Sequence, residues 1–415
     1  MYSPGYYEYF CPVKTVAGHD SLEQIPELLA GLGASRPMII TDKGVVAAGL
    51  VDIVSQAMNP AMPAVAVEDD VPVDSDVETV HRIASVYRKS QCDALVAVGG
   101  GSVMDTAKGV NIVVSEEAES LLDFAGAGAL KRPLNPLVAV PTTAGTGSEV
   151  TLVAVIADPS VNRKLLFTSN FLLPDVAVLD SRMTLTLPPH LTAATGMDAL
   201  THAVEAYTCL SKNPISDGLA LEAISMISRN LLNVVENPED KEGRLALATA
   251  ATYAGMAFSN SMVGMVHTLG HSVGSACHVG HGTCMAILLP YGLEYNLHKN
   301  GEWTAELLYA LGGETLFAAT PPEKRAEKSI ACIRAMNEAL YNATGGRHSR
   351  CFKEVVDASG APMVPESKLA EVAATALGDG SIFYNPEELD YEDALMVMKA
   401  AWGGEPLDRT LVKTG

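Results

Sequence analysis

Two patterns of hydrophobic and polar positions divide the chain. In roughly the first 185 residues, short apolar runs alternate with stretches in which apolar residues recur every three or four positions. The short runs are typical of buried strands and the periodic stretches of amphipathic helices. Their alternation predicts a parallel sheet covered by helices on both faces. The runs that we expect to be strands cover residues 36–42, 64–72, 92–102, 135–149 and 175–180.

The pattern changes near residue 185, and the chain after it is helical in periodicity almost throughout. Clear examples are residues 217–237, 243–262 and 304–313, while Pro188 and Pro189 mark the break itself. A chain of 415 residues is also longer than one hydrophobic core usually supports. We therefore predict an α/β domain of residues 1–185 followed by an all-helical domain of residues 186–415.

Two loops in the first half are suited to bind phosphate. Three glycines in "VAVGGGSVMDTAKG" follow a predicted strand and precede a predicted helix, so backbone amides and a helix N-terminus are available to an anion. The motif is not G-x-G-x-x-G, and a glycine turn after a strand is often only a turn. A second loop, "PTTAGTGSE", offers further donors after the next strand, and open α/β sheets bind ligands at the carboxyl ends of their strands. The residues concerned are Gly99, Gly100, Gly101, Thr142, Thr143, Thr146 and Ser148.

An acidic residue ends another predicted strand. Asp42 follows "MIIT", where a carboxylate suits ribose hydroxyls and repels a 2′-phosphate, so it favours NAD over NADP. The alternative is that Asp42 only caps a helix or turn.

The second half contains candidate metal ligands. Asp198 and His202 are four positions apart and so share one face of a helix, as a surface ion pair or as half of a metal site. Two further imidazoles would complete a set that suits Fe(II), Zn(II) or Mn(II), and the absence of thiolates disfavours structural zinc. The alternative is a group of buried structural histidines. Four of the ten histidines lie within fifteen residues: His267, His271, His278 and His281.

Composition narrows the partners and the compartment. A formal net charge of −21 argues against nucleic acid, whose phosphates need a basic surface. Seven irregularly spaced cysteines without a CxxC motif are typical of a reduced protein. The N-terminus does not read as a signal peptide, and no run of 18 apolar residues could span a membrane. We therefore expect a cytoplasmic protein that binds small molecules and neither nucleic acid nor membranes.

Four long motifs resemble the iron-containing (group III) NAD-dependent alcohol dehydrogenases: "GGGSVMDTAK", "PTTAGTGSE", "GMDALTHAVEAY" and "HTLGHSVGSACHVGHG". The resemblance continues to a C-terminal "NPEELDYEDALMVMKAAW" and covers essentially the whole chain. It implies a dinucleotide-binding α/β domain followed by an all-helical metal-binding domain. It also implies metal ligation by Asp198, His202, His267 and His281, with His271 and His278 on the substrate side as catalytic residues. Expected cofactor contacts are Asp42, Gly99, Gly100, Gly101, Ser102, Asp105, Thr142, Thr143, Thr146, Ser148 and Lys164.

The activity implied by the resemblance is metal-dependent, NAD(H)-linked oxidation of primary alcohols or diols and reduction of their aldehydes. Fe(II) is the expected metal, with Zn(II) second, and His271 is the candidate to relay the hydroxyl proton. The N-terminal "YYEYFCPVKTVAG" would pair two copies as a homodimer or larger oligomer.

The chain departs from the family pattern at three positions, and two rival functions remain. Val73 and Val153 stand where many members have a polar residue near the cofactor, and Glu387 replaces an Arg. One rival is a dehydroquinate-synthase-like lyase, which also uses NAD and a metal. It would need basic residues near the metal, and Lys and Arg are scarce in these segments. The other rival is a non-catalytic structural member, which the filled ligand positions disfavour.

Overall fold

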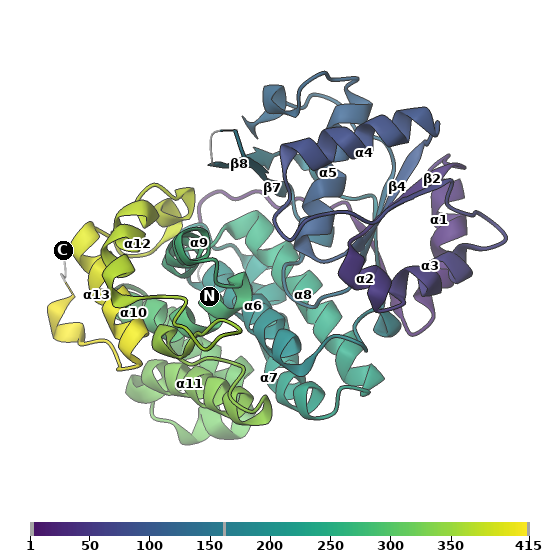
Figure 1. The fold of residues 1–415 in the computed structure, drawn as a ribbon. Helices are drawn as coiled ribbons and strands as arrows, with labels where there is room; N and C mark the ends of the chain where they lie inside the picture. The colour runs from purple at the N-terminus through teal and green to yellow at the C-terminus, as the bar shows by residue number, and fades with distance from the viewer. Residues whose placement is uncertain (1–3, 161–162, 413–415) are drawn as a thin grey trace. The chain divides into compact units, whose positions relative to one another are not determined.

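The computed structural model describes residues 4–160 and 163–412. They form two compact units that are not contiguous in sequence. The first, called the α/β unit here, contains Phe10–Leu187 and Glu239–Ser259. The second, the helical unit, contains Pro188–Pro238 and the chain from Asn260 on, with the segment that ends at Tyr9. The predicted fold class, a parallel-sheet domain with an all-helical domain, is confirmed (Figure 1).

The α/β unit is built on a six-stranded sheet in which every strand pair is parallel. All five predicted strands form in it, together with an edge strand, β1, that the apolar pattern did not indicate. In spatial order the strands are β1 (Lys14–Gly18), β9 (Val176–Asp180), β6 (Leu137–Pro141), β4 (Ala94–Gly99), β2 (Pro37–Ile40) and β3 (Ala66–Glu68).

Alternate side chains of each central strand enter opposite cores, as the two-residue period of a strand requires. In β2, Met38 and Ile40 pack on one face of the sheet and Ile39 on the other. The first core includes α4 (Val77–Lys89) and α5 (Gly101–Ser115), and the second includes α1 (Ile25–Gly31) and α3 (Leu50–Met58). Figure 1 shows these helices on opposite sides of the sheet, with the short α2 (Lys43–Ala47) beside α3. Burial on both faces explains why the strands appear as continuous apolar runs.

A smaller sheet in the same unit was not predicted. It contains β5 (Gly126–Ala127), β8 (Arg163–Thr168) and β7 (Val153–Asp158), in that order. Strands β7 and β8 are antiparallel, and β7 alternates between buried and more exposed residues because only one of its faces is covered.

Helix α8 (Lys241–Ser261) covers all but the last residue of the helical stretch predicted at 243–262. Most of this helix belongs to the α/β unit. Each predicted domain, residues 1–185 and residues 186–415, is one continuous segment. In the structure, α8 follows residue 185 in sequence but is mostly part of the α/β unit. Its Thr252 hydroxyl donates to Glu149 Oε1 at 2.7 Å, and its Gly255 lies directly against Gly147.

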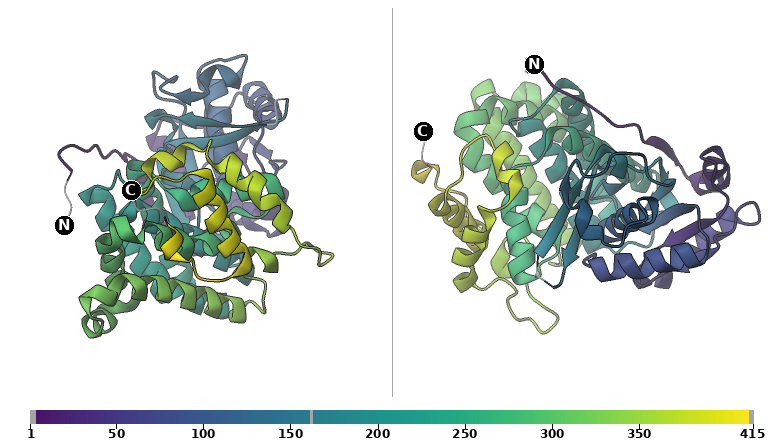
Figure 2. Two further views of the ribbon diagram at one scale, coloured as in Figure 1. Left: turned by 90° about the vertical axis from the view of Figure 1, so that its left-hand side faces the viewer. Right: turned by 90° about the horizontal axis from the view of Figure 1, so that it is seen from above.

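The helical unit contains α6 (Pro189–Thr208), α7 (Pro214–Glu236), α9 (Met265–Cys277), α10 (His281–Ala319), α11 (Arg325–Ala343), α12 (Leu369–Ala376) and α13 (Tyr391–Gly403) (Figure 2). Side-chain caps begin two of them: Asn213 accepts from Ser216 N in α7, and Asp390 accepts from Asp393 N in α13. Helix α6 begins with the predicted proline break and packs against α7 and α10.

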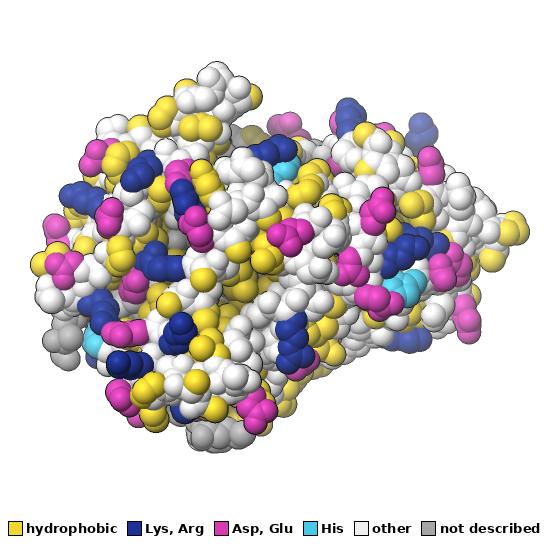
Figure 3. Space-filling model, turned by 90° about the horizontal axis from the view of Figure 1, so that it is seen from below, with side chains coloured by type: hydrophobic (Ala, Val, Ile, Leu, Met, Phe, Trp, Pro, Cys, Tyr) yellow, Lys and Arg dark blue, Asp and Glu magenta, His cyan; other side chains and the backbone are white. Residues whose placement is uncertain are grey.

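The surface charges and the helix lengths are two separate features of the molecule. On the face drawn in Figure 3, acidic and basic side chains are interspersed and no basic patch forms. Within the described part of the chain, no helix combines the length and the apolar character that crossing a membrane requires.

Candidate functional site

Four side chains in the helical unit form a candidate metal centre. Asp198, His202, His267 and His281 each offer one ligand atom, and these atoms all lie within 4.8 Å of one another. The first three residues are buried, and His281 is partly exposed. The structure thus brings together the four residues proposed as ligands, from α6 and from the consecutive helices α9 and α10.

Helices α6 and α10 position three of these ligands. Asp198 and His202 are one turn apart on α6, with Asp198 Oδ1 4.0 Å from His202 Nδ1. His281 is the first residue of α10, and its Nε2 lies 3.3 Å from Asp198 Oδ1. A Cβ on Gly282 would lie 2.4 Å from the Ala194 carbonyl oxygen of α6. Gly282 is therefore needed for the close approach of α10 to α6 that brings His281 to Asp198.

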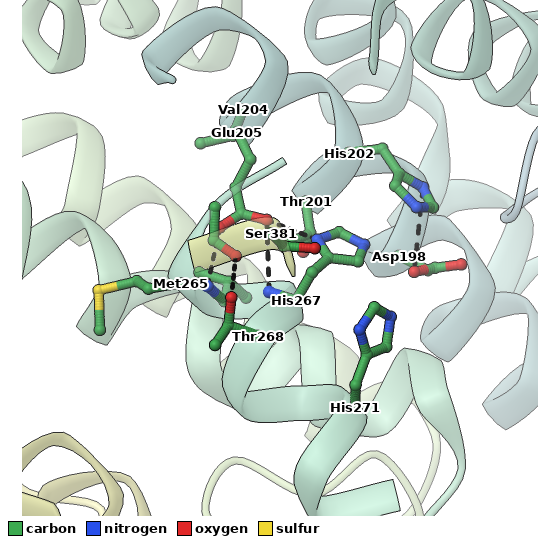
Figure 4. Close-up of polar contacts among 12 residues, drawn as sticks. Asp198, Thr201, His202, Val204, Glu205, Met265, His267, Thr268, His271 and Ser381 are labelled. Atoms are coloured by element: carbon green, nitrogen blue, oxygen red, sulfur yellow. Dashed lines mark hydrogen bonds and ion pairs between the residues drawn. The ribbon is translucent and has the colours of Figure 1, made fainter. Parts of the chain in front are cut away.

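The fourth ligand is held by a carboxylate that sequence reasoning missed. Glu205 lies on the same helix as Asp198 and His202, and its Oε2 is 2.5 Å from His267 Nδ1. His267 Nε2 is buried and makes no hydrogen bond within the described residues. In Figure 4, the His267 ring lies between Glu205 and the space beside Asp198 and His202. The ring nitrogen opposite Glu205 is therefore available for a metal ion.

Burial and mutual charge set the protonation of the cluster. Burial lowers the pKa of His202 to about 3 and that of His267 well below 6.5. Burial acts to raise the pKa of Asp198, but the neighbouring imidazoles outweigh it and the pKa is lowered. At neutral pH these imidazoles are uncharged with lone pairs available, and Asp198 is ionised. Both are the forms that bind metals.

The two imidazoles predicted to be catalytic differ in their surroundings. The His271 ring is 5.3 Å from that of His281 and 5.7 Å from that of His267, centroid to centroid. Its Nδ1 is 2.8 Å from Asp379 Oδ2, and its side chain is 45% exposed, so solvent reaches it. His278 is exposed and ends α9 in a left-handed conformation, with φ of 56°. Among the described residues, His278 has no part in the ring contacts that join the other four imidazoles.

The two donor loops of the α/β unit lie side by side. Gly99 ends β4, Gly100 caps α5, and Thr142 N donates to Gly99 O at 3.1 Å. A Cβ on Gly100 would be 3.4 Å from Thr143 Oγ1, and one on Gly101 would be 3.0 Å from Thr146 Cγ2. The glycines therefore bring the first turn of α5 against the second loop, as expected for loops at adjacent strand ends.

Several of the residues proposed to contact a cofactor are engaged with other protein groups. Asp105 accepts from Ser148 Oγ at 3.1 Å and from Val155 N at 3.0 Å. Lys164 pairs with Asp74 at 2.7 Å on the surface. The Ser102 hydroxyl donates to the carbonyl of Val73, whose own side chain is fully exposed. Asp42 accepts from Val45 N at 2.9 Å and caps α2, so the capping role considered from the sequence is present at this strand end.

A buried lysine that sequence reasoning missed joins the loops of the α/β unit. Lys108 Nζ donates to Ser148 Oγ at 3.1 Å, to Thr151 and to the Val153 carbonyl at 2.8 Å. Burial lowers the pKa of Lys108 to about 8. The motif "GGGSVMDTAK" contains this lysine, but nothing local in the sequence shows that it is buried.

A parallel-sheet unit with paired donor loops and a helical unit with three imidazoles and one carboxylate are the parts expected of an enzyme that uses a dinucleotide and a metal. Comparison with known proteins gives the family. Residues 12–181 match the iron-containing alcohol dehydrogenase family, and residues 192–402 match the C-terminal domain of the Fe-containing alcohol dehydrogenase family. The chain belongs to the iron-containing alcohol dehydrogenases.

Three relatives match over nearly their whole lengths. The 1,3-propanediol dehydrogenase of Klebsiella pneumoniae is 35% identical, over 95% of this chain and 99% of that protein. The NAD-dependent methanol dehydrogenase of Bacillus methanolicus is 32% identical, over 95% of this chain and 99% of that protein. The solved structure of an alcohol dehydrogenase from Oenococcus oeni is 32% identical and covers 96% of this chain and all of its own, with a TM-score of 0.88.

Proposed function

We propose that this protein interconverts primary alcohols or diols and their aldehydes, using NAD(H) and a divalent metal held by Asp198, His202, His267 and His281. The cluster of these four ligand atoms within 4.8 Å of one another is the observation that supports the proposal most directly. Family membership supports the reaction type, and relatives named for 1,3-propanediol and methanol support small primary alcohols as substrates.

The residues present fit a divalent ion with an open coordination position. Asp198 is buried beside imidazoles, and the buried His267 Nε2 lacks a hydrogen bond within the described residues. Three imidazoles and one carboxylate are four ligands, so a position remains for substrate. When bound, the ion supplies Lewis-acid chemistry to the substrate oxygen. We expect Fe(II) to be the native ion and Zn(II) the alternative, with the family as the reason for that order.

The α/β unit supplies the groups expected to bind NAD(H). The glycines at the start of α5 and the threonines of the second loop offer backbone amides and hydroxyls to the phosphates. Asp42 lies at the end of β2, where its carboxylate disfavours the 2′-phosphate of NADP. When bound, the nicotinamide supplies the hydride chemistry.

His271 is the residue proposed to move the hydroxyl proton. Its Nδ1 faces Asp379 Oδ2 at 2.8 Å, which holds the ring in one orientation and leaves Nε2 to exchange a proton. Its exposure gives that proton a path to water. We further propose a cytoplasmic homodimer or larger homo-oligomer, in which the exposed aromatic residues of the N-terminal segment, Tyr6 and Phe10 among them, become buried.

Metal removal and reloading test the proposal. Chelated protein should form no NADH from 1,3-propanediol or 1-butanol, and Fe(II) added without oxygen should restore the activity more fully than Zn(II) or Mn(II). His202→Ala should bind less than one ion per chain, whereas the control His190→Ala, on the same helix but outside the cluster, should bind a full equivalent. Full activity of the chelated protein, or turnover only with a charged sugar acid, would contradict the proposal.

A further inference from the structure

Glu205 is a buried carboxylate whose ion-pair partner is a histidine rather than a Lys or Arg. It is 6% exposed, and among the described residues its ion pair is with His267. It follows Asp198 and His202 along α6 at spacings of seven and three residues, so all three carboxylate and imidazole groups lie on one face of the helix. A buried carboxylate is costly unless its oxygens accept hydrogen bonds.

Both oxygens of Glu205 are directed at the start of α9, the helix that carries His267. Oε1 accepts from Val266 N at 2.8 Å, and Oε2 accepts from His267 N at 3.4 Å. The first amides of a helix have no partner within the helix, and the N-cap residue here, Gly264, has no side chain to supply one. Glu205 of α6 therefore takes the place of an N-cap side chain for α9.

Gly264 is itself explained by this arrangement. A Cβ at that position would lie 3.2 Å from Glu205 Oε1 and 2.9 Å from Asn385 Oδ1, which accepts from Met265 N at 3.2 Å. The two oxygens occupy the space that a capping side chain would fill. The first turn of α9 is thus fastened to α6 and to the segment around Asn385, and not to its own preceding loop.

The same carboxylate determines which nitrogen of His267 carries the proton. Glu205 Oε2 is 2.5 Å from Nδ1, and both carboxylate oxygens already accept from backbone amides, so the carboxylate is the acceptor in this contact and Nδ1 is the donor. A neutral imidazole has a single N–H, so the buried Nε2 retains its lone pair. That nitrogen faces the other ligands of the cluster.

We propose that Glu205 is the positioning residue of the metal centre: it fixes both the place of His267, by capping α9 from α6, and the tautomer in which His267 Nε2 can bind the ion. This inference rests on the proposed function, since it assigns a role in holding the metal that the function requires. A partner of this kind behind a ligating histidine typically contributes 10- to 100-fold in metal affinity.

Glu205→Gln is the decisive variant, because an amide cannot satisfy both contacts. If the amide oxygen accepts from Val266 N, the NH₂ group faces His267 Nδ1 and requires it to be an acceptor, which moves the proton to Nε2. If the oxygen instead accepts from Nδ1, the NH₂ group opposes the Val266 N–H and α9 loses its cap. Glu205→Asp keeps an acceptor-only group on a shorter side chain, so it should preserve the tautomer and recover part of the affinity.

Co(II) affinity is the first measurement, made by titrating the metal-free protein and following the visible absorption of the bound ion. We expect Glu205→Gln to weaken binding at least 10-fold and Glu205→Asp to weaken it less. The control is Asp217→Asn, which removes the partner of the buried Lys212 in the same unit, 2.5 Å away, and should lower thermal stability but leave Co(II) affinity unchanged. Unchanged affinity and absorption in Glu205→Gln would overturn the inference, whereas failure of the unsubstituted protein to bind Co(II) would overturn the proposed function instead.

The second measurement needs no Glu205 variant to fold. Nitrogen-15 spectra of histidine-labelled, metal-free protein should show His267, identified by the loss of its signals in His267→Asn, with a protonated Nδ1 and a bare Nε2. A protonated Nε2 in the unsubstituted protein would overturn the inference. Where Glu205→Gln folds, its spectrum should show the opposite tautomer or a mixture.

Discussion

The contact between Gly255 of α8 and Gly147 of the second donor loop offers a sharp test of how the α/β unit holds its cofactor loops. A Cβ added at Gly255 would lie 2.8 Å from the Gly147 carbonyl oxygen and 2.9 Å from its Cα. Normal non-bonded contacts to carbon begin at about 3.5 Å. Both opposing atoms belong to the backbone and cannot rotate away, so in Gly255→Ala the helix and the loop must separate.

The expected cost follows from two opposing effects. Overpacking of this kind destabilises by about 1–3 kcal/mol, while alanine in a helix interior gains about 1 kcal/mol over glycine. Because the overlapping atoms belong to the backbone, we expect an overpacking cost of about 3 kcal/mol. After the gain from alanine, the free energy of unfolding should fall by about 2 kcal/mol. For a unit of this size that loss lowers the melting temperature by roughly 4–8 °C. Gly147→Ala should cost more, since Gly147 has φ of 63° and three backbone atoms within 3.1 Å of its Cβ position.

The assay combines thermal melting with NADH binding followed by nicotinamide fluorescence. Gly255→Ala should melt lower and bind NADH several-fold more weakly, because Thr142, Thr143 and Thr146 move with the loop. Gly218→Ala is the control, since Gly218 is an exposed residue of α7 with nothing within 4 Å of its Cβ position, and it should be neutral or stabilising. A Gly255→Ala protein as stable as the unsubstituted one, with the same NADH affinity, would refute the reasoning.

Four further predictions follow from individual contacts. Asp42→Gly should raise affinity for NADPH relative to NADH at least 10-fold, by removing repulsion of the 2′-phosphate; equal use of both cofactors by the unsubstituted protein would contradict it. Asp379→Ala should lower kcat by about 10- to 100-fold, because His271 loses its orientation, while the stoichiometry of bound metal stays the same. Burial lowers the pKa of His348 from 6.5 to about 4, so the unfolded chain binds a proton that the folded one does not as the pH falls through this window. That difference removes about 3 kcal/mol of stability between pH 6.5 and 4, and urea unfolding of His348→Asn should show a correspondingly shallower dependence on pH. Light scattering at dilute concentration should give at least twice 43.6 kDa, and a 43.6 kDa species alone would exclude self-association through the N-terminal segment.

The parts of the fold that the sequence predicts well are those buried on both faces. Strands β2, β4, β6 and β9 are continuous apolar runs because each has a core on either side. The β7–β8 hairpin was missed because only alternate residues of β7 are buried, and its neighbouring strand is largely exposed. Helical periodicity correctly placed α8, but periodicity does not say which unit a helix packs against.

In the candidate metal centre, spacing along the sequence could predict only which residues share one face of the same helix. Asp198 and His202 are a turn apart, and the same reasoning extended by three residues finds Glu205 on that face. Asp379 could not be found in this way, because it is 108 residues from His271 and is brought to it only by packing. The role of Gly282 could not be found in this way either, because its missing Cβ admits the Ala194 carbonyl of α6 only once α10 packs there.

The charges in the cluster explain why a divalent ion fits it better than a monovalent one. Asp198 and Glu205 are both buried, and among the described residues the ion pairs of both are with histidines and not with Lys or Arg. Burial lowers the pKa values of His202 and His267, so these imidazoles are uncharged at neutral pH and do not compensate the charge of Asp198. Burial also raises the pKa of Glu205 to about 7. A buried carboxylate without a cationic partner is strongly unfavourable. An ion of charge +2 would offset the charge of Asp198 and would also favour the ionised form of Glu205, so the site would need no basic side chain. The scarcity of Lys and Arg in these segments is also the argument against an anionic substrate. Among the described residues, the ion pairs of Asp198 and Glu205 with histidines alone are equally what a divalent cation bound beside them would require.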